Sequence, residues 1–164
     1  MQIPLTSMEQ LLPFPTVQEL IKKKHEPLVS ASPGAMVQAA LQLMADKHIG
    51  FLAVIDGGRL VGVLSERDCA RRVILQQLPA ASTPVREIMT TQVHTVAPEN
   101  KVTECIVLMH AKHIRHLPVV RGSECVGVLS VRDLMGALIQ RHERLLRLLH
   151  EERLTLMYPD PSSY

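Results

Sequence analysis

The chain has 164 residues, of which 46% are hydrophobic, with three cysteines, no tryptophan and a formal net charge of +2. This length fits one compact domain or two small ones packed together, and the evenly mixed charges argue against a nucleic-acid-binding surface. We find no secretory signal and no apolar run of about 18 residues, so we expect no membrane span and a cytoplasmic location. The odd, scattered cysteines fit reduced thiols in that compartment.

The first 15 residues contain three prolines and no clear hydrophobic period, so we interpret them as an N-terminal arm. Thr16 is placed to cap a short helix whose apolar positions have helical spacing. That helix would end in the lysine run 22–24, which suits the negative end of the helix dipole. Such a run is more often simply a solvated face, and this is the interpretation we favour.

The next segment gives signals in the order strand, helix, strand, strand, helix. We expect an extended segment at 27–30, a helix starting at Pro33-Gly34, a hairpin of strands 51–55 and 60–64 around Asp56-Gly57-Gly58, and a helix beginning at Ser65. A segment rich in Ala, Pro, Ser and Thr follows. We expect this segment to be a linker, and Pro84 suits the first position of the short helix that follows it.

The octapeptide 61–68, Val-Gly-Val-Leu-Ser-Glu-Arg-Asp, returns with one change at 126–133, which is 65 residues later. The same shift aligns the preceding segments without a gap, so the chain is one unit written twice. In the second copy we expect a strand at Thr95-Val96, a helix over 101–112, strands at 117–120 and 125–129 around a turn at 121–123, and a helix from Val131.

The last helix does not stop where its counterpart does, because leucines continue along it toward Met157. Something must cover this apolar stripe. A helix laid back on the rest of the chain is our default expectation, and a dimer contact is the next possibility. The predicted organisation is an arm (1–15), a first repeat (16–78), a linker (79–83), a second repeat (84–140) and a C-terminal helical extension with tail (141–164).

Each octapeptide ends in Ser-x-x-Asp directly after a strand. The structural interpretation is a helix capping box, in which Ser65 and Ser130 accept hydrogen bonds from backbone N–H groups. The carboxylates of Asp68 and Asp133 then interact favourably with the positive end of the helix dipole. The functional interpretation uses the same geometry, because a carboxylate at such a turn can accept two hydroxyls from a ribose. Both interpretations remain open on the residues alone.

The pattern Gly-Val-Leu-Ser-x-x-Asp, preceded by Leu-Pro-Val-Val and a glycine turn, resembles a CBS domain. Two in tandem, over roughly residues 17–140, resemble a CBS pair, or Bateman module. The resemblance implies an α/β (α+β) fold with two β-α-β-β-α units packed about a pseudo-twofold axis, extended here by a C-terminal helix. It also implies homodimers and clefts for an adenosine-containing ligand, AMP first, with ATP, ADP, NAD or S-adenosylmethionine as further possibilities.

The resemblance carries site residues over position by position. Asp68 and Asp133 match the ribose carboxylate, beside Ser65 and Ser130; Arg115, His116 and Arg132 match phosphate-side positions; Arg67 is an additional candidate; Ser30, Ala31, Thr95 and Val96 border the base. Repeat one has Gly50-Phe51 where repeat two has Arg115-His116. We therefore expect the main site to join Asp68 with Arg115, His116 and Arg132, and a weaker cleft at Asp133 that lacks the first two.

Rival chemistries have weaker support. The spacing His110-x-x-His113-x-x-His116 could suggest zinc, but His113 repeats His48 and no acidic or Cys cluster completes a site, so no metal is expected. No nucleophile–base arrangement predicts an enzyme. Cys69 and Cys105 could form a redox sensor, although small buried thiols are commoner on helix faces.

Two hypotheses remain. The first is a regulatory module that senses an adenine nucleotide and acts in trans on an unidentified protein target, through ligand-dependent packing of a dimer. The alternative is a ligand-free structural dimerisation scaffold that keeps the capping residues only for stability.

Overall fold

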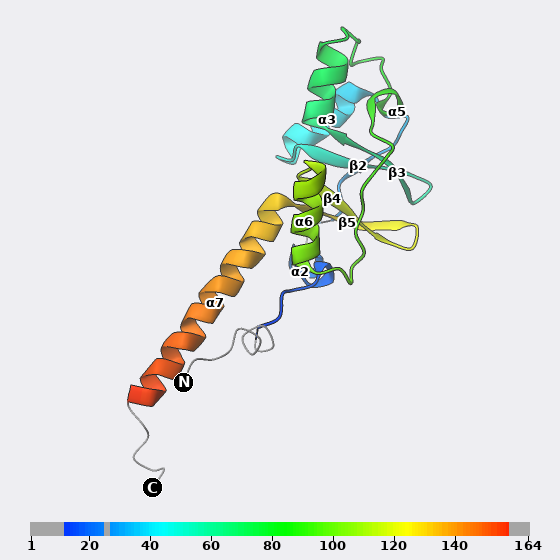
Figure 1. Ribbon diagram of the computed structural model, residues 1–164. Coiled ribbons are helices and arrows are strands. Elements are labelled where there is room, and N and C mark those ends of the chain that lie inside the picture. Colours follow the sequence, from blue (N-terminus) through cyan, green and yellow to red (C-terminus); the bar gives the residue numbers. More distant parts are fainter. Residues whose placement is uncertain (1–11, 25–26, 158–164) are drawn as a thin grey trace.

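The computed structural model describes residues 12–24 and 27–157 (Figure 1). Its elements are α2 (Val17–Lys24), β1 (Ser30–Ala31), α3 (Val37–Asp46), β2 (Phe51–Asp56), β3 (Arg59–Ser65), α4 (Glu66–Asp68), the π-helix η1 (Cys69–Ile74), α5 (Val85–Ile88), α6 (Val102–Lys112), β4 (His116–Arg121), β5 (Glu124–Ser130) and α7 (Val131–Met157). Most of the predicted N-terminal arm and the end of the predicted tail lie outside the described residues. Within them, no helix is both long enough and apolar enough to cross a membrane.

The predicted order of elements is confirmed, with four local differences. The helix expected to start at Pro33-Gly34 begins only at Val37, with Met36 as its N-cap, and residues 33–34 form a turn before it. Thr95-Val96 does not form a strand, because Val96 alone makes a bridge, to Val119. Pro84 is the N-cap of α5 rather than its first residue. The helix after Ser65 is one short α-helical turn followed by η1, whereas its counterpart α7 is α-helical throughout.

The five strands form one sheet in the order β1-β2-β3-β5-β4. The β4–β5 register is the β2–β3 register shifted by one repeat, so that His116 pairs with Ser130 as Phe51 pairs with Ser65. Within the sheet, the described strands of the two repeats are joined by one β3–β5 pair, Arg59 with Glu124. The order β2-β3-β5-β4 is therefore the same from either end, as expected for two units related by a pseudo-twofold axis, and β1 is matched in repeat two only by the Val96 bridge.

The two short helices exchange places between the repeats. Val17 and Leu20 of α2, which belongs in sequence to the first repeat, are buried in the core of repeat two. Val85 and Ile88 of α5, which belongs in sequence to the second repeat, are buried in the core of repeat one. Backbone bonds hold this exchange, for example Val17 N–H to the Asn100 carbonyl. Cutting the chain between the predicted repeats would thus separate each core from one of its helices.

The glycine of each octapeptide gives room to the exchanged helix. A Cβ placed on Gly127 would lie 2.8 Å from Cδ1 of Ile21, and one placed on Gly62 would lie 2.7 Å from Sδ of Met89. Real Cβ atoms do not approach other atoms so closely, so a side chain here would require Ile21 or Met89 to move. The repeated glycine is therefore explained by close packing between repeats.

The long helix α7 begins on the core and then leaves it. Leu134 is buried, and Arg141 donates to the Leu12 carbonyl (3.0 Å) and stacks over the Phe14 ring. Farther along, Leu146 and Leu149 are exposed, and Figure 1 shows α7 projecting away from the sheet. The expectation of a helix laid back on the module is therefore wrong for its second half, because few described groups face it there.

Candidate functional site

A cavity of about 790 Å³ lies where the two repeats meet. Its walls come from the end of α2, the segment before β1, the α3–β2 turn, the start of β4, β5 and the start of α7. The side chains able to form polar contacts are Lys24, Lys47, His48, Arg115, His116, Ser130, Arg132 and Asp133. Four of them are permanently basic and one is acidic, so the cavity favours an anionic occupant.

Asp133 sits at one wall as part of a capping box. The Ser130 N–H and O–H donate to Asp133 Oδ2 at 2.6 and 2.7 Å, and the Asp133 N–H donates back to Ser130 Oγ at 3.3 Å. Ser65 and Asp68 form the same box in repeat one, with O–H to Oδ2 at 2.6 Å. The capping interpretation is confirmed for both pairs, and ribose binding by either carboxylate stays a prediction.

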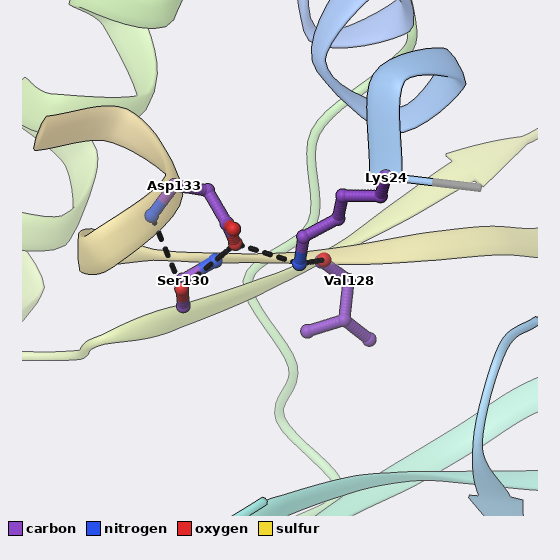
Figure 2. A network of polar contacts seen from close by, with 4 residues as sticks. All are labelled: Lys24, Val128, Ser130 and Asp133. Carbon is purple, nitrogen blue, oxygen red and sulfur yellow. Dashed lines mark hydrogen bonds and ion pairs between the residues drawn. The ribbon is translucent and has the colours of Figure 1, made fainter. Parts of the chain in front are cut away.

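The two boxes differ in one partner. Lys24 Nζ lies 2.7 Å from Asp133 Oδ2 and donates to the Val128 carbonyl at 3.2 Å, as Figure 2 shows. Within the described residues Asp68 forms no ion pair. Burial alone would raise the pKa of Asp133, but hydrogen bonds from Lys24 and Ser130 outweigh it and hold that pKa below its usual value. Asp133 is thus an ionised, half-buried carboxylate.

A stacked ring pair also lines the cavity. Phe51 of β2 and His116 of β4 lie 4.6 Å apart between centroids at 15°, which joins the two repeats across the cavity. Burial, together with the positive charge of Arg115, lowers the pKa of His116 below its usual value, and Asp133 opposes this only in part. The imidazole is therefore mainly neutral at neutral pH.

This lowered pKa predicts a loss of stability on mild acidification. The unfolded chain binds a proton at His116 before the folded one does, so stability is present above the ordinary histidine pKa of about 6.5 and falls as pH drops through it. We expect the free energy of unfolding, measured by urea titration, to decline less between pH 7 and 5 in His116→Phe, which keeps the stack. Parallel pH curves for the two proteins would contradict the assignment.

The structure brings the expected site residues together in a different combination from the one that the sequence predicts. Arg115, His116, Ser130, Arg132 and Asp133 line one cavity together. The expectation that the Asp133 cleft lacks Arg115 and His116 is therefore wrong. The residues outside this cavity's lining are Ser30, Ala31, Ser65, Arg67, Asp68, Thr95 and Val96. The reason is the fold: β4 starts beside the end of its own partner β5, which brings His116 level with Ser130.

Sequence reasoning missed several lining residues. Lys47 and His48 could have been found, because Lys112 and His113 repeat them and so mark a shared structural position. Lys24 was assigned to a solvated face, and nothing near it in the sequence marks it otherwise. It reaches Asp133 only because α2 packs on the other repeat.

The histidine and cysteine patterns have structural explanations. His48 and His113 share a left-handed backbone (φ 52° for both) just after their helices, which confirms a common structural role. Among the described residues, no group of three or more His, Cys, Asp or Glu is placed to hold a metal ion. Cys69 and Cys105 are free and buried, and burial raises the pKa of each to about 11, which disfavours the reactive thiolate.

Comparison with known proteins gives consistent matches. Residues 17–75 and 85–140 match the CBS domain. The chain is 36% identical over 118 residues to the mitochondrial CBS domain-containing protein CBSX3 of Arabidopsis thaliana, a match that covers 68% of this chain and 57% of that protein. It therefore spans little more than half of this relative.

Solved structures match over most of the chain. The crystal structure of the CBS domain NE2398 has a TM-score of 0.73 and 38% identity, covering 77% of this chain and 98% of that one. The CBS domain protein PAE2072 of Pyrobaculum aerophilum, complexed with AMP, has a TM-score of 0.68 and 29% identity, covering 79% and 99%.

Proposed function

Because this chain belongs to the CBS domain family and carries two copies of the domain, we propose that it is a regulatory module that senses an adenosine-containing nucleotide. The observation that carries this proposal is the cavity in which Asp133 lies with Arg115 and Arg132. A carboxylate can accept two ribose hydroxyls, and Arg is the favoured side chain for phosphate. The AMP complex of the P. aerophilum protein makes AMP the first ligand to test.

The charge of the cavity ranks the other candidates. Lys24, Lys47, Arg115 and Arg132 face a single carboxylate, so anionic AMP, ADP, ATP and NAD suit it better than S-adenosylmethionine, whose sulfonium is positive. We propose that the ligand changes how the repeats, or the halves of a dimer, pack, and that a separate protein target responds to this change. The module would act by binding rather than by catalysis, in a reducing compartment such as the cytoplasm that suits its free thiols.

Thermal unfolding against AMP, ADP, ATP, NAD and S-adenosylmethionine tests the sensing function. A ligand at 100 times its dissociation constant adds about 2.7 kcal/mol to stability, which raises the midpoint by roughly 5–10 °C for a chain of this size. We expect AMP or another anionic nucleotide to give this shift. No shift with any of the five ligands would favour the alternative, a ligand-free dimerisation scaffold.

The exposed stripe on α7 favours a homodimer under either alternative. Met135, Ile139, Leu146 and Leu149 lie on one helix face and expose 37–54% of their surface. Their spacings of four, seven and three residues are those of a coiled-coil seam. A second copy of the chain presents the same stripe, so two α7 helices can cover each other about a twofold axis.

We expect wild-type protein to sediment as a dimer and the double variant Ile139→Lys/Leu146→Lys as a monomer, because two lysines in each stripe repel their partners. Val107→Lys is the control, since Val107 is 68% exposed and belongs to another helix, α6. A double variant that remains dimeric would place the dimer interface elsewhere, and a monomeric wild type would remove the dimer from the proposal.

A further inference from the structure

A second cavity, of about 860 Å³, is lined by α2, the segment 12–15 and the first half of α7. The two cavities share three lining residues, Lys24, Arg132 and Asp133. The Lys24–Asp133 ion pair therefore stands at the boundary between them. Figure 2 shows Lys24 reaching from the end of α2 to the start of α7 to close this contact.

The second cavity is strongly basic. Two acidic side chains line it, Glu19 and Asp133, together with six basic ones. The lining residues thus carry a formal charge of +4, compared with +2 for the whole chain. The six basic residues are Lys22, Lys23, Lys24, Arg132, Arg141 and Arg144. Arg141 is held by the Leu12 carbonyl and the Phe14 ring. Among the described residues, the four exposed cations of this set, Lys22, Lys23, Arg132 and Arg144, form no ion pair. A polyanion entering this space would therefore meet four cations that are not already engaged in an ion pair.

Lys24 is the cation of this set that already has an anionic partner, which a ligand could replace. It is 32% exposed and its partner Asp133 is 19% exposed, so each charge depends on the other. A neutral nucleoside that takes the Asp133 carboxylate for its ribose would leave the half-buried Lys24 without an anionic partner, with only the Val128 carbonyl as acceptor, which is unfavourable. A ligand with a phosphate brings its own anion and can replace Asp133 as the partner of Lys24.

The matched box in repeat one lacks this cation. The buried residues of α2 and α5 correspond, Val17 to Val85 and Leu20 to Ile88, and the same shift of 68 residues places Gln92 at the position of Lys24. The cation is therefore a feature of the Asp133 side alone and not a requirement of the capping box.

We propose that the two cavities form one site for a nucleotide with a phosphate chain, in which Lys24 exchanges Asp133 for a phosphate and the chain extends into the basic cavity between α2 and α7. This inference rests on the proposed nucleotide-sensing function and narrows its ligand class to phosphorylated nucleotides, with affinity rising with the number of phosphates. Lys24 is then a specificity-determining residue, because it penalises an unphosphorylated ligand.

Calorimetric titration with adenosine, AMP and ATP tests this on four proteins: wild type, Lys24→Met, Arg144→Gln and the control Lys112→Met, whose exposed lysine lines neither cavity. In Lys24→Met we expect AMP affinity to fall about 10-fold while adenosine affinity holds or rises, a loss of roughly one charge-assisted contact. In Arg144→Gln we expect ATP affinity to fall about 3- to 10-fold and AMP affinity to hold. The control should bind as wild type does.

Two results would overturn the inference while leaving nucleotide sensing intact. One is an equal change, or none, in adenosine and AMP affinity for Lys24→Met. The other is an unchanged ATP affinity for Arg144→Gln. If wild type binds no nucleotide, the proposed function fails, and tripolyphosphate then probes the basic cavity alone: a thermal shift lost in Arg144→Gln but kept in Lys112→Met supports an anion site, and its absence removes that site too.

Discussion

Asp133→Ala is expected to abolish nucleotide binding at the cavity, lowering affinity at least about 100-fold. The carboxylate would hold ribose through charge-assisted hydrogen bonds of about 1.5–3 kcal/mol each, and the loss of two of them exceeds 2.8 kcal/mol. The same change removes the α7 cap, about 1 kcal/mol, and the half-exposed pair with Lys24, up to about 1 kcal/mol. Calorimetric titration with AMP measures the first effect and urea unfolding the second.

Asp68→Ala provides the matched control, because Asp68 closes the same capping box without a lysine and does not line the cavity. We expect it to cost only the cap, about 1 kcal/mol, and to leave AMP binding at the Asp133 cavity within a few fold of wild type. If instead Asp68→Ala abolishes AMP binding and Asp133→Ala does not, the binding site is the one expected from the sequence, around Asp68.

The largest losses of stability are expected on truncation of the leucine just before each capping serine. Leu64 and Leu129 occupy equivalent positions, one in each core, and neither exposes any surface. Leu→Ala at a fully buried site costs about 2–5 kcal/mol, because transfer free energy is lost and a cavity remains. Urea unfolding of each variant measures this, with Leu75→Ala, at 76% exposure, as the control.

Both leucine variants should still unfold in a single transition. Each core contains residues of a helix that belongs in sequence to the other repeat, Val17 in one direction and Val85 in the other, so neither repeat can lose its packing alone. A loss of unfolding free energy below about 1 kcal/mol in either Leu→Ala variant would contradict the burial of that leucine in its core. Two separate transitions would show that the exchanged helices do not couple the cores.

The elements themselves could be predicted because their causes are local or repeated. The apolar runs on either side of Asp56-Gly57-Gly58 predict the first hairpin, and the shift of 65 residues predicts the second hairpin in the same way. The Ser-x-x-Asp spacing likewise predicted both capping boxes, because a box closes within four residues. The CBS resemblance came from the same repeated octapeptide, and the family match confirmed it.

The sequence by itself thus determined the two repeats, the order of their strands and helices, and the two carboxylates that could hold a ligand. It did not determine which groups surround each carboxylate. The hydrophobic period of α2 predicts which of its faces is buried, but not which repeat buries it. The contacts of Lys24 with β5 and with Asp133 join residues more than a hundred positions apart, so no local pattern predicts them. Only the tertiary structure decided that Asp133 and not Asp68 shares its cavity with the basic residues, because the β4–β5 register brings Arg115 and His116 level with Ser130 and the exchange of α2 brings Lys24.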